Sequence, residues 1–206
     1  MDCFHYPLDT ETLLRKKRRL RRELLAQMGV PQFEVVPALG EEIASPGLSP
    51  AQLVEVLSRQ KAEEVAVQAG PDDVVIAADT VVAVDGAVLG KPRDPADAAR
   101  MLSLLSGRAH TVYTGVTVRR GTFSRTAHEA TQVRFRPLTQ SEISAYIATG
   151  EPMDKAGAYG IQGYGALLVE GIQGDYYNVM GLPVCRLGCL LRQLGVDCLS
   201  LAAGQG

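Results

Sequence analysis

The segment from Val74 to Pro92, VVIAADTVVAVDGAVLGKP, constrains the fold of this chain more than any other. It contains two apolar runs separated by Asp85-Gly86. An Asp-Gly pair between apolar runs predicts a β-hairpin with a type I′ turn, because both central residues of that turn need a positive φ. The turn would pair Val84 with Ala87, which fixes the register of the two strands.

The same register brings polar side chains to one end of this apolar hairpin. Counting outward from the turn places Thr80 opposite Lys91 and puts Asp79 within diagonal reach of the Lys91 ammonium group. Charge at a buried strand end costs free energy unless it is paired or used in function. Two interpretations stand side by side: a structural salt bridge that closes the hairpin, and a functional site.

The composition is that of an ordinary globular protein, with 206 residues, 46% hydrophobic and 21% charged. The formal net charge of −2 argues against a general affinity for nucleic acid. No apolar stretch approaches the roughly 20 residues that span a bilayer, and the start lacks a signal-peptide pattern, so we expect a cytoplasmic protein without membrane association. Cys185 and Cys189 lie four residues apart in a helical pattern, and we interpret them as reduced core residues.

Capping signals and hydrophobic periodicity predict a succession of helices and strands. Ser49-Pro50 begins a helix that runs to about Gln68, and Lys61 falls on its apolar stripe. Asp94-Pro95 and the capping box Thr139–Glu142 begin two further helices, which end at glycines. The other expected elements are a helix that ends at Gly29, strands over residues 33–37, 110–119 and 126–136, and a final helix over 184–194.

Residues 150–181 hold eight of the 21 glycines, a density too high for regular structure. Glycine lets the backbone approach a ligand closely and present its amide groups to it, although a string of tight turns would have the same composition. Gln162 lies within this segment. Its side-chain amide both donates and accepts hydrogen bonds, which suits a nucleobase edge or a ribose.

Seven motifs in the chain point to one family. They are RQKAE (59–63), ADTVV (78–82), LGKP (89–92), LSGRAHTVYTG (105–115), FRPL (135–138), GEPMDKAGAYGIQG (150–163) and GLP (181–183). Together they resemble the Maf family, the septum-formation-inhibitor-like nucleotide pyrophosphatases. The resemblance implies an α/β fold in which a mixed, twisted sheet with flanking helices forms two lobes around a cleft, as in the inosine triphosphate pyrophosphatases. It implies a single Maf-like domain over residues 21–206, after a divergent basic segment over residues 1–20.

The resemblance also implies a reaction: hydrolysis of a nucleoside triphosphate to the monophosphate and pyrophosphate, with Mg²⁺ or Mn²⁺ as cofactor. The sequence AYGIQG (158–163) resembles the branch of the family that acts on dTTP and UTP. Modified pyrimidine nucleotides would fit the same contacts, and a house-cleaning role is implied. The resemblance further suggests a homodimer.

The positions that match the family's functional residues are, for catalysis, Asp79, Lys61 and Lys91, and, for substrate selectivity, Thr80 and Gln162. Asp79 and Glu42 match acidic residues near the metal. A carboxylate beside two lysines is better suited to binding a metal and positioning the attacking water than to strong general-base action. Proton abstraction by Asp79 is the second interpretation.

The N-terminal segment departs from the family's pattern. Members carry a Ser-x-Ser-Pro-Arg-Arg motif that binds phosphate at the start of a helix, where this chain has Arg18-Arg19-Leu20-Arg21. We expect the retained Arg21 to contact substrate and the altered motif to weaken phosphate binding, and the preceding residues lack the pattern of a buried strand. The alternative function is a catalytically weakened protein that binds nucleotide or nucleic acid through the basic residues 15–22; a solvated helix is the simpler interpretation of that run.

Overall fold

The computed structural model describes residues 2–5, 16–30 and 33–203, with residues 2–5 and 16–20 described by their backbone. The chain divides into two compact units. Unit 1 comprises Met1–Asp79, Thr114–Glu129 and Gly181–Gly206, and unit 2 comprises Thr80–Tyr113 and Ala130–Met180. The domain limits expected from the sequence, 1–20 and 21–206, stay a prediction.

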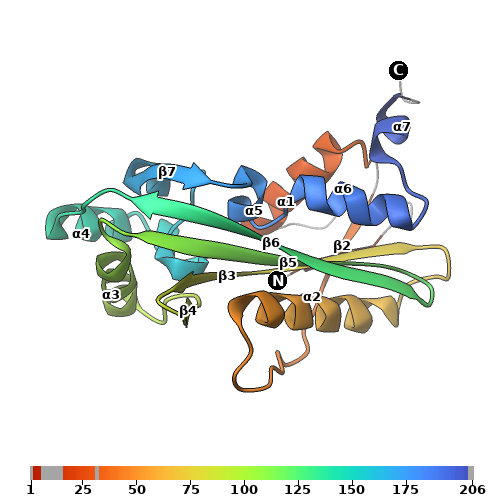
Figure 1. Cartoon of the computed structure of the whole chain (residues 1–206), viewed down its shortest axis with the longest axis horizontal. Coiled ribbons are helices and arrows are strands. Elements are labelled where there is room, and N and C mark those ends of the chain that lie inside the picture. The colour runs from red at the N-terminus through yellow and green to blue at the C-terminus, as the bar shows by residue number, and fades with distance from the viewer. Residues whose placement is uncertain (1, 6–15, 31–32, 204–206) are drawn as a thin grey trace. The chain divides into compact units, whose positions relative to one another are not determined.

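The described strands form one seven-stranded sheet with the order β2-β1-β3-β5-β6-β7, in which β4 also pairs with β3 (Figure 1). Three of the strands, β3, β5 and β6, carry residues of both units. The strand bounds are β1 Asp2–His5, β2 Glu34–Pro37, β3 Val74–Val84, β4 Ala87–Leu89, β5 Ala109–Arg120, β6 Phe123–Phe135 and β7 Val169–Gln173. The predicted α/β class, with helices flanking a sheet, is confirmed.

The helices follow the capping signals closely. Ser49 and Thr139 form capping boxes with the third residue of their helices, and the Asp94 side chain accepts the Asp97 N–H. The helix bounds are α1 Lys16–Gln27, α2 Pro50–Ala66, α3 Pro95–Leu105, α4 Gln140–Ala148, α5 Tyr176–Met180, α6 Val184–Gln193 and α7 Cys198–Ala203. Short 3₁₀ helices are η1 Glu151–Asp154, η2 Ala156–Ala158 and η3 Tyr164–Leu168. Among the helices described, none is long and apolar enough to cross a membrane.

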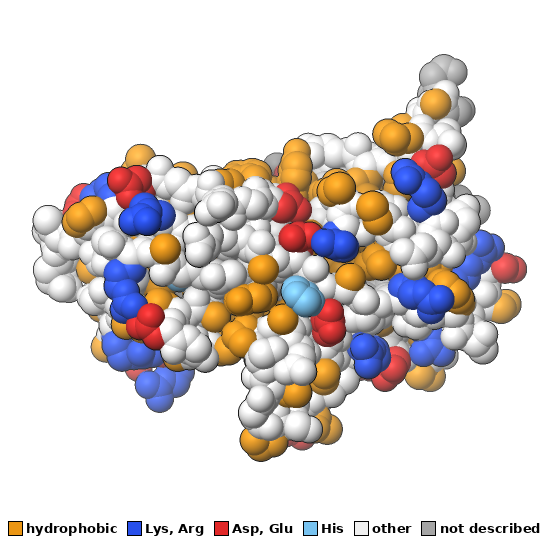
Figure 2. All heavy atoms as spheres, viewed as in Figure 1, with side chains coloured by type: hydrophobic (Ala, Val, Ile, Leu, Met, Phe, Trp, Pro, Cys, Tyr) orange, Lys and Arg blue, Asp and Glu red, His pale blue; other side chains and the backbone are white. Residues whose placement is uncertain are grey.

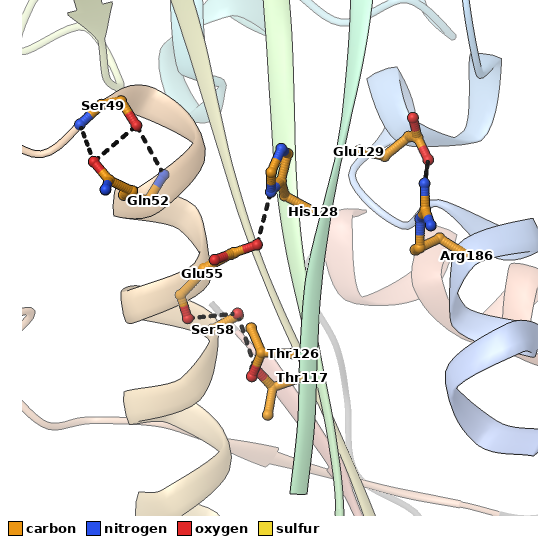
Figure 3. A network of polar contacts seen from close by, with 9 residues as sticks. All are labelled: Ser49, Gln52, Glu55, Ser58, Thr117, Thr126, His128, Glu129 and Arg186. Carbon is orange, nitrogen blue, oxygen red and sulfur yellow. Dashed lines mark hydrogen bonds and ion pairs between the residues drawn. The ribbon is translucent and has the colours of Figure 1, made fainter. Parts of the chain in front are cut away.

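In unit 1, two consecutive residues of β6 show which helices cover the two faces of the sheet. His128 Nδ1 lies 2.7 Å from Glu55 Oε1 on α2. The next residue, Glu129, accepts a hydrogen bond from Arg186 on α6 at 3.0 Å (Figure 3). Because successive strand side chains point to opposite faces, α2 lies on one face of this part of β6 and α6 lies on the other.

Helix α2 packs directly on the backbone of β5. A Cβ atom added to Gly115 would lie 2.1 Å from the Val54 carbonyl oxygen, so only glycine fits at this crossing. Two residues further along the same face of β5, Thr117 Oγ1 lies 3.0 Å from Ser58 Oγ and 2.9 Å from Thr126 Oγ1. Figure 3 shows this row of hydroxyl groups beneath the helix. The glycine therefore sets how close α2 lies, and the hydroxyls satisfy one another under it.

The predicted hairpin is confirmed at its turn. Asp85 and Gly86 have φ values of 50° and 78°, and Val84 pairs with Ala87. The register continues to Val82 and Leu89, where β4 ends. The expected pairing of Thr80 with Lys91 is wrong, because the strand does not extend that far.

The chain leaves the ladder just after Leu89. The Gly90 carbonyl accepts the N–H of Gly157 at 3.0 Å, so the backbone of Gly90 is hydrogen-bonded to η2.

The apolar core of unit 2 draws residues from β3, β4, α3, β5, β6, α4, η2 and η3. Its largest fully buried side chains include Phe135, Leu102 and Leu105.

The interpretation of Cys185 and Cys189 as core residues is wrong, because both are exposed. The buried face of α6 carries Leu187, Leu190 and Leu191. The two cysteines are four residues apart and share the solvent-facing side of the helix.

Two segments expected to be irregular contain regular structure. Within residues 150–181, the helices η1–η3 are short, but β7 pairs with β6 and α5 follows it, so the glycine density did not exclude a strand and a helix. Residues 2–5 form β1, which pairs with β2 and β3. Four residues are too few to show a strand periodicity, and the pairing is made by backbone groups that a side-chain pattern does not report.

Candidate active site

Lys61 and Asp79 form a buried ion pair in unit 1. Lys61 Nζ on α2 lies 2.5 Å from Asp79 Oδ1 on β3, and the residues are 5% and 1% exposed. Val75 and Ala77, which share a strand face with Asp79, pack with Ala62 and Val65 of α2. Buried charges are tolerated when oppositely charged groups pair with each other. Packing of the apolar stripe of α2 against β3 places Lys61 next to the Asp79 carboxylate.

A second carboxylate reaches the same ammonium group. Glu42 Oε1 lies 2.9 Å from Lys61 Nζ, and its side chain is half exposed. Glu42 belongs to the loop between β2 and α2, which has no regular structure. The cluster Glu42–Lys61–Asp79 therefore carries two negative charges and one positive charge, and its more exposed end is a carboxylate.

Two further side chains of α2 hold the loop that carries Glu42. Glu64 Oε1 accepts the N–H groups of Leu39 at 2.7 Å and Gly40 at 3.0 Å. Gln60 accepts the N–H of Ile43 at 3.3 Å and donates to the carbonyl oxygen of the same residue. Glu42 lies between these two attachments. Neither residue was predicted to be functional, although Gln60 is part of the RQKAE motif.

Arg21 is buried in unit 1 and contacts backbone carbonyl groups. Its Nε donates to the Gly181 oxygen at 3.0 Å, and Nη1 donates to the Ala78 oxygen at 3.4 Å. It is 5% exposed. Arg21 therefore connects α1 to Ala78, the residue before Asp79, and to Gly181, which lies shortly before α6. Its contact with substrate stays a prediction.

Unit 2 carries the three other residues singled out from the sequence. Thr80 on β3 is partly buried, whereas Lys91 is exposed beyond the end of β4. Gln162 is also exposed, and its Nε2 donates to the sulfur of Met180 at 3.4 Å. The structure thus brings Lys61, Asp79 and Glu42 together, and the roles of the three residues of unit 2 stay predictions.

The loop around Gln162 is built on Glu151, a carboxylate that was not predicted to be functional. Glu151 is 9% exposed and accepts the Tyr146 hydroxyl at 2.9 Å. It also accepts the N–H groups of Tyr164 at 3.0 Å and Gly165 at 3.1 Å. Its place in the GEPMDKAGAYGIQG motif was visible, but nothing in the sequence distinguishes a buried acid there from a solvated one.

The donor set of unit 1 fits a hard divalent cation. Among the described residues, no group of three or more His, Cys, Asp and Glu side chains could hold a metal ion. Asp79 and Glu42 offer two carboxylates, however, and Mg²⁺ is commonly held by one or two carboxylates together with water and substrate phosphates. The residues present therefore suit Mg²⁺ or Mn²⁺ bound jointly with a phosphate ligand.

Comparison with known proteins decides the family. Residues 18–194 match the family model described as Maf-like protein. The chain belongs to the Maf family. The match begins within α1 and ends at the residue after α6, so it takes in the cluster of unit 1 and the Gln162 loop of unit 2.

Relatives within the Maf family are similar over nearly their whole length. The chain is 56% identical over 181 residues to a protein of Moorella thermoacetica, an alignment that covers 86% of this chain and 91% of that protein. It is 52% identical over 184 residues to one of Symbiobacterium thermophilum, with 89% and 94% covered. A protein of Agathobacter rectalis is 51% identical over 194 residues, with 86% and 94% covered. All three relatives are named dTTP/UTP pyrophosphatase.

Proposed function

We propose that this chain is a nucleoside triphosphate pyrophosphatase that hydrolyses dTTP and UTP to the monophosphate and pyrophosphate. The observation that carries the proposal is the buried Lys61–Asp79 pair with Glu42 on the same ammonium group. Relatives at 51–56% identity are named for this reaction. A triphosphate brings about four negative charges, so its site needs cationic groups and a metal to hold it.

The reaction forms one bond and breaks one at the α-phosphorus. The oxygen of a water molecule attacks this phosphorus, and the bond to the α,β-bridging oxygen breaks, so that pyrophosphate leaves with the electron pair. In our proposal Asp79 accepts a hydrogen bond from the attacking water and holds it in line. The proton released from the water passes to solvent or, in the second interpretation, to Asp79.

Lys61 orients the carboxylates in this proposal. Its ammonium group holds Asp79 in one position and draws Glu42 toward it. Asp79 and Glu42 are the residues that would hold Mg²⁺ or Mn²⁺. The bound cation would withdraw negative charge from the phosphoryl oxygens.

The other residues have roles in substrate binding in our proposal. Gln162 makes a two-point contact with the N3–H and carbonyl edge of uracil or thymine, since its amide offers one acceptor and one donor. Thr80 contributes to selectivity, Lys91 neutralises phosphate charge, and Arg21 contacts substrate. A homodimer and a cytoplasmic location belong to the same proposal.

The nucleic-acid-binding alternative depends on residues 15–22. Residue 15 lies outside the described residues, and residues 16–20 are described only by their backbone. Arg21 is buried against backbone carbonyl groups, whereas Arg22 is exposed. On the face drawn in Figure 2, acidic and basic side chains are interspersed, as the near-balanced net charge of −2 leads one to expect. The interspersed charges of this face favour the pyrophosphatase over a nucleic-acid-binding protein.

Pyrophosphate release from dTTP, UTP, CTP, 7-methyl-GTP and ATP, measured with Mg²⁺ or Mn²⁺, tests the proposal. We expect turnover of dTTP and UTP that Asp79→Asn abolishes. Folded wild-type protein that releases no pyrophosphate from dTTP or UTP would refute it. Steeply salt-dependent binding to DNA or RNA would then favour the alternative.

A further inference from the structure

We propose that Glu151 and Tyr146 are positioning residues that fix the loop of residues 159–165 and so make Gln162 selective for uracil and thymine over cytosine. The inference rests on the proposed function, because it assumes that Gln162 contacts the base. It concerns unit 2 alone. Neither residue is proposed to touch substrate.

The two side chains hold the loop on both sides of Gln162. Before Gln162, the N–H of Gly160 donates to the Tyr146 hydroxyl oxygen at 3.1 Å. After it, the N–H groups of Tyr164 and Gly165 donate to Glu151 at 3.0 and 3.1 Å. The Tyr146 hydroxyl donates in turn to Glu151 at 2.9 Å, which joins the two attachments into one network. Gln162 itself is exposed at the middle of the held segment.

Close packing leaves this loop little freedom to shift. A Cβ atom at Gly163 would lie 2.0 Å from Glu151 Oε2, and one at Gly165 would lie 2.7 Å from the Tyr146 hydroxyl. At Gly160, an added Cβ would lie 2.6 Å from Cε of Lys155. Gly163 and Gly165 therefore let the backbone lie directly against Glu151 and Tyr146, and Gly160 leaves room for the Lys155 side chain. This packing explains three of the eight glycines in residues 150–181, for which the sequence left ligand approach and tight turns as alternatives.

The protonation of the network matches its geometry. Burial pushes the pKa of Glu151 upward, but the N–H groups of Gly165 and Tyr164 and the Tyr146 hydroxyl outweigh burial and bring it below its ordinary value. Burial raises the pKa of Tyr146 well above its ordinary value. Near neutral pH the network is thus a carboxylate that accepts three donors and a neutral hydroxyl that donates to it.

A fixed loop matters because uracil and cytosine have donors and acceptors at opposite positions of their hydrogen-bonding edge. Uracil offers N3–H and a carbonyl oxygen, whereas cytosine offers an acceptor at N3 and an amino group. A glutamine that is free to turn its amide over can satisfy either base. Gln162 donates from Nε2 to Met180, so a fixed loop favours one orientation of the amide. Loosening the loop should therefore cost selectivity as well as rate.

The test compares kcat and KM for dTTP and CTP in the full-length protein carrying Tyr146→Phe or Glu151→Gln. Tyr146→Phe removes the hydroxyl, and Glu151→Gln places an NH₂ group against a backbone donor. We expect kcat/KM for dTTP to fall about tenfold and the dTTP-to-CTP ratio to fall by a similar factor, while CTP turnover changes by less than about twofold. Faster amide exchange at Tyr164 and Gly165 should accompany these changes.

The matched control is Glu142→Gln, which removes a carboxylate of α4 that has no hydrogen bond or ion pair with the described residues of the loop. Glu142 is the third residue of the α4 capping box, where glutamine can take the same place, so this variant should leave the selectivity ratio unchanged. An unchanged ratio in Tyr146→Phe and in every anchor variant that folds would overturn the inference alone. Absence of dTTP turnover in the wild type would overturn the proposed function and the inference with it.

Discussion

The Lys61 ammonium group lies 2.5 Å from Asp79 and 2.9 Å from Glu42, so one buried cation serves two carboxylates. Asp79 is nearly inaccessible to solvent, whereas Glu42 is half exposed. Water can solvate the Glu42 carboxylate but hardly reaches that of Asp79. Asp79 therefore depends on Lys61 for charge compensation more than Glu42 does.

Replacing Lys61 with methionine should destabilise the protein by about 3–5 kcal/mol, because Asp79 is left as an uncompensated buried charge. Urea unfolding measures the change. The double variant Lys61→Met/Asp79→Asn should be more stable than the single variant, since it leaves no buried charge behind. A double variant no more stable than the single one would show that the pair is not the source of the effect. Both variants should lose pyrophosphatase activity.

The loop that carries Glu42 should loosen when Glu64 is replaced with alanine. Glu64 accepts the N–H groups of Leu39 and Gly40, and these amides should exchange with solvent faster in the variant. Glu42 would then be held less firmly at Lys61, and the Mn²⁺ concentration for half-maximal activity should rise about tenfold. Glu63→Ala, one residue earlier and exposed, is the control and should change neither quantity. Unaltered amide exchange at Leu39 and Gly40 in Glu64→Ala would show that Glu64 does not hold this loop.

Alanine at Gly115 should destabilise unit 1 severely. The new Cβ would overlap the carbonyl group of Val54, and the neighbour is backbone that cannot turn away. Overpacking typically costs about 1–3 kcal/mol, and a backbone overlap should reach or exceed that range. Gly188→Ala in α6 is the matched control, because its Cβ would meet only the far end of Met28 at 4.0 Å. That variant should gain about 0.5–1 kcal/mol from helix propensity, and equal effects of the two substitutions in urea unfolding would refute the packing argument.

His110 should make stability fall in mildly acidic solution. Burial lowers its pKa from 6.5 to about 4 in the folded protein, where Nε2 lies 2.8 Å from the Tyr159 hydroxyl and Nδ1 has no partner among the described residues. The unfolded chain therefore binds more protons between these two values. The stabilising contribution of neutral His110 is complete above about pH 6.5 and is lost as the pH falls toward 4. Over this range the free energy of unfolding should fall by about 3 kcal/mol in total.

Urea unfolding of the wild type and His110→Gln between pH 4 and 7 checks the effect of His110. The wild type should lose stability more steeply than the variant as the pH falls, by up to about 1.4 kcal/mol per pH unit. Parallel curves would show that His110 does not carry this dependence.

Much of the fold could be predicted because its signals are local. Ser49, Asp94 and Thr139 satisfy N–H groups within three residues, and the Asp85-Gly86 turn is a property of two residues. The lysine on the stripe of α2 was visible because helical periodicity places Lys61 among buried residues. The family resemblance implied that Lys61 and Asp79 are functional positions, but their contact with each other was not predicted.

What could not be predicted depends on contacts between distant segments. Glu64 binds Leu39 and Gly40, which precede it by 25 and 24 positions in the sequence. The loop that contains them shows no hydrophobic periodicity from which this contact could be predicted. The burial of Glu151 depends on backbone donors that a glycine-rich loop turns toward it. Cys185 and Cys189 are exposed because the opposite face of α6, with Leu187, Leu190 and Leu191, is the buried one. The four-residue spacing shows only that the two cysteines share a face of the helix, not which face is buried.

Hydrolysis of dTTP in water enriched in ¹⁸O identifies the phosphorus that water attacks. If water attacks the α-phosphorus, we expect dTMP that carries the ¹⁸O label, together with unlabelled pyrophosphate, and loss of both products in Asp79→Asn. Release of labelled inorganic phosphate with dTDP, or label in the pyrophosphate, would place the attack at another phosphorus and refute the proposed reaction.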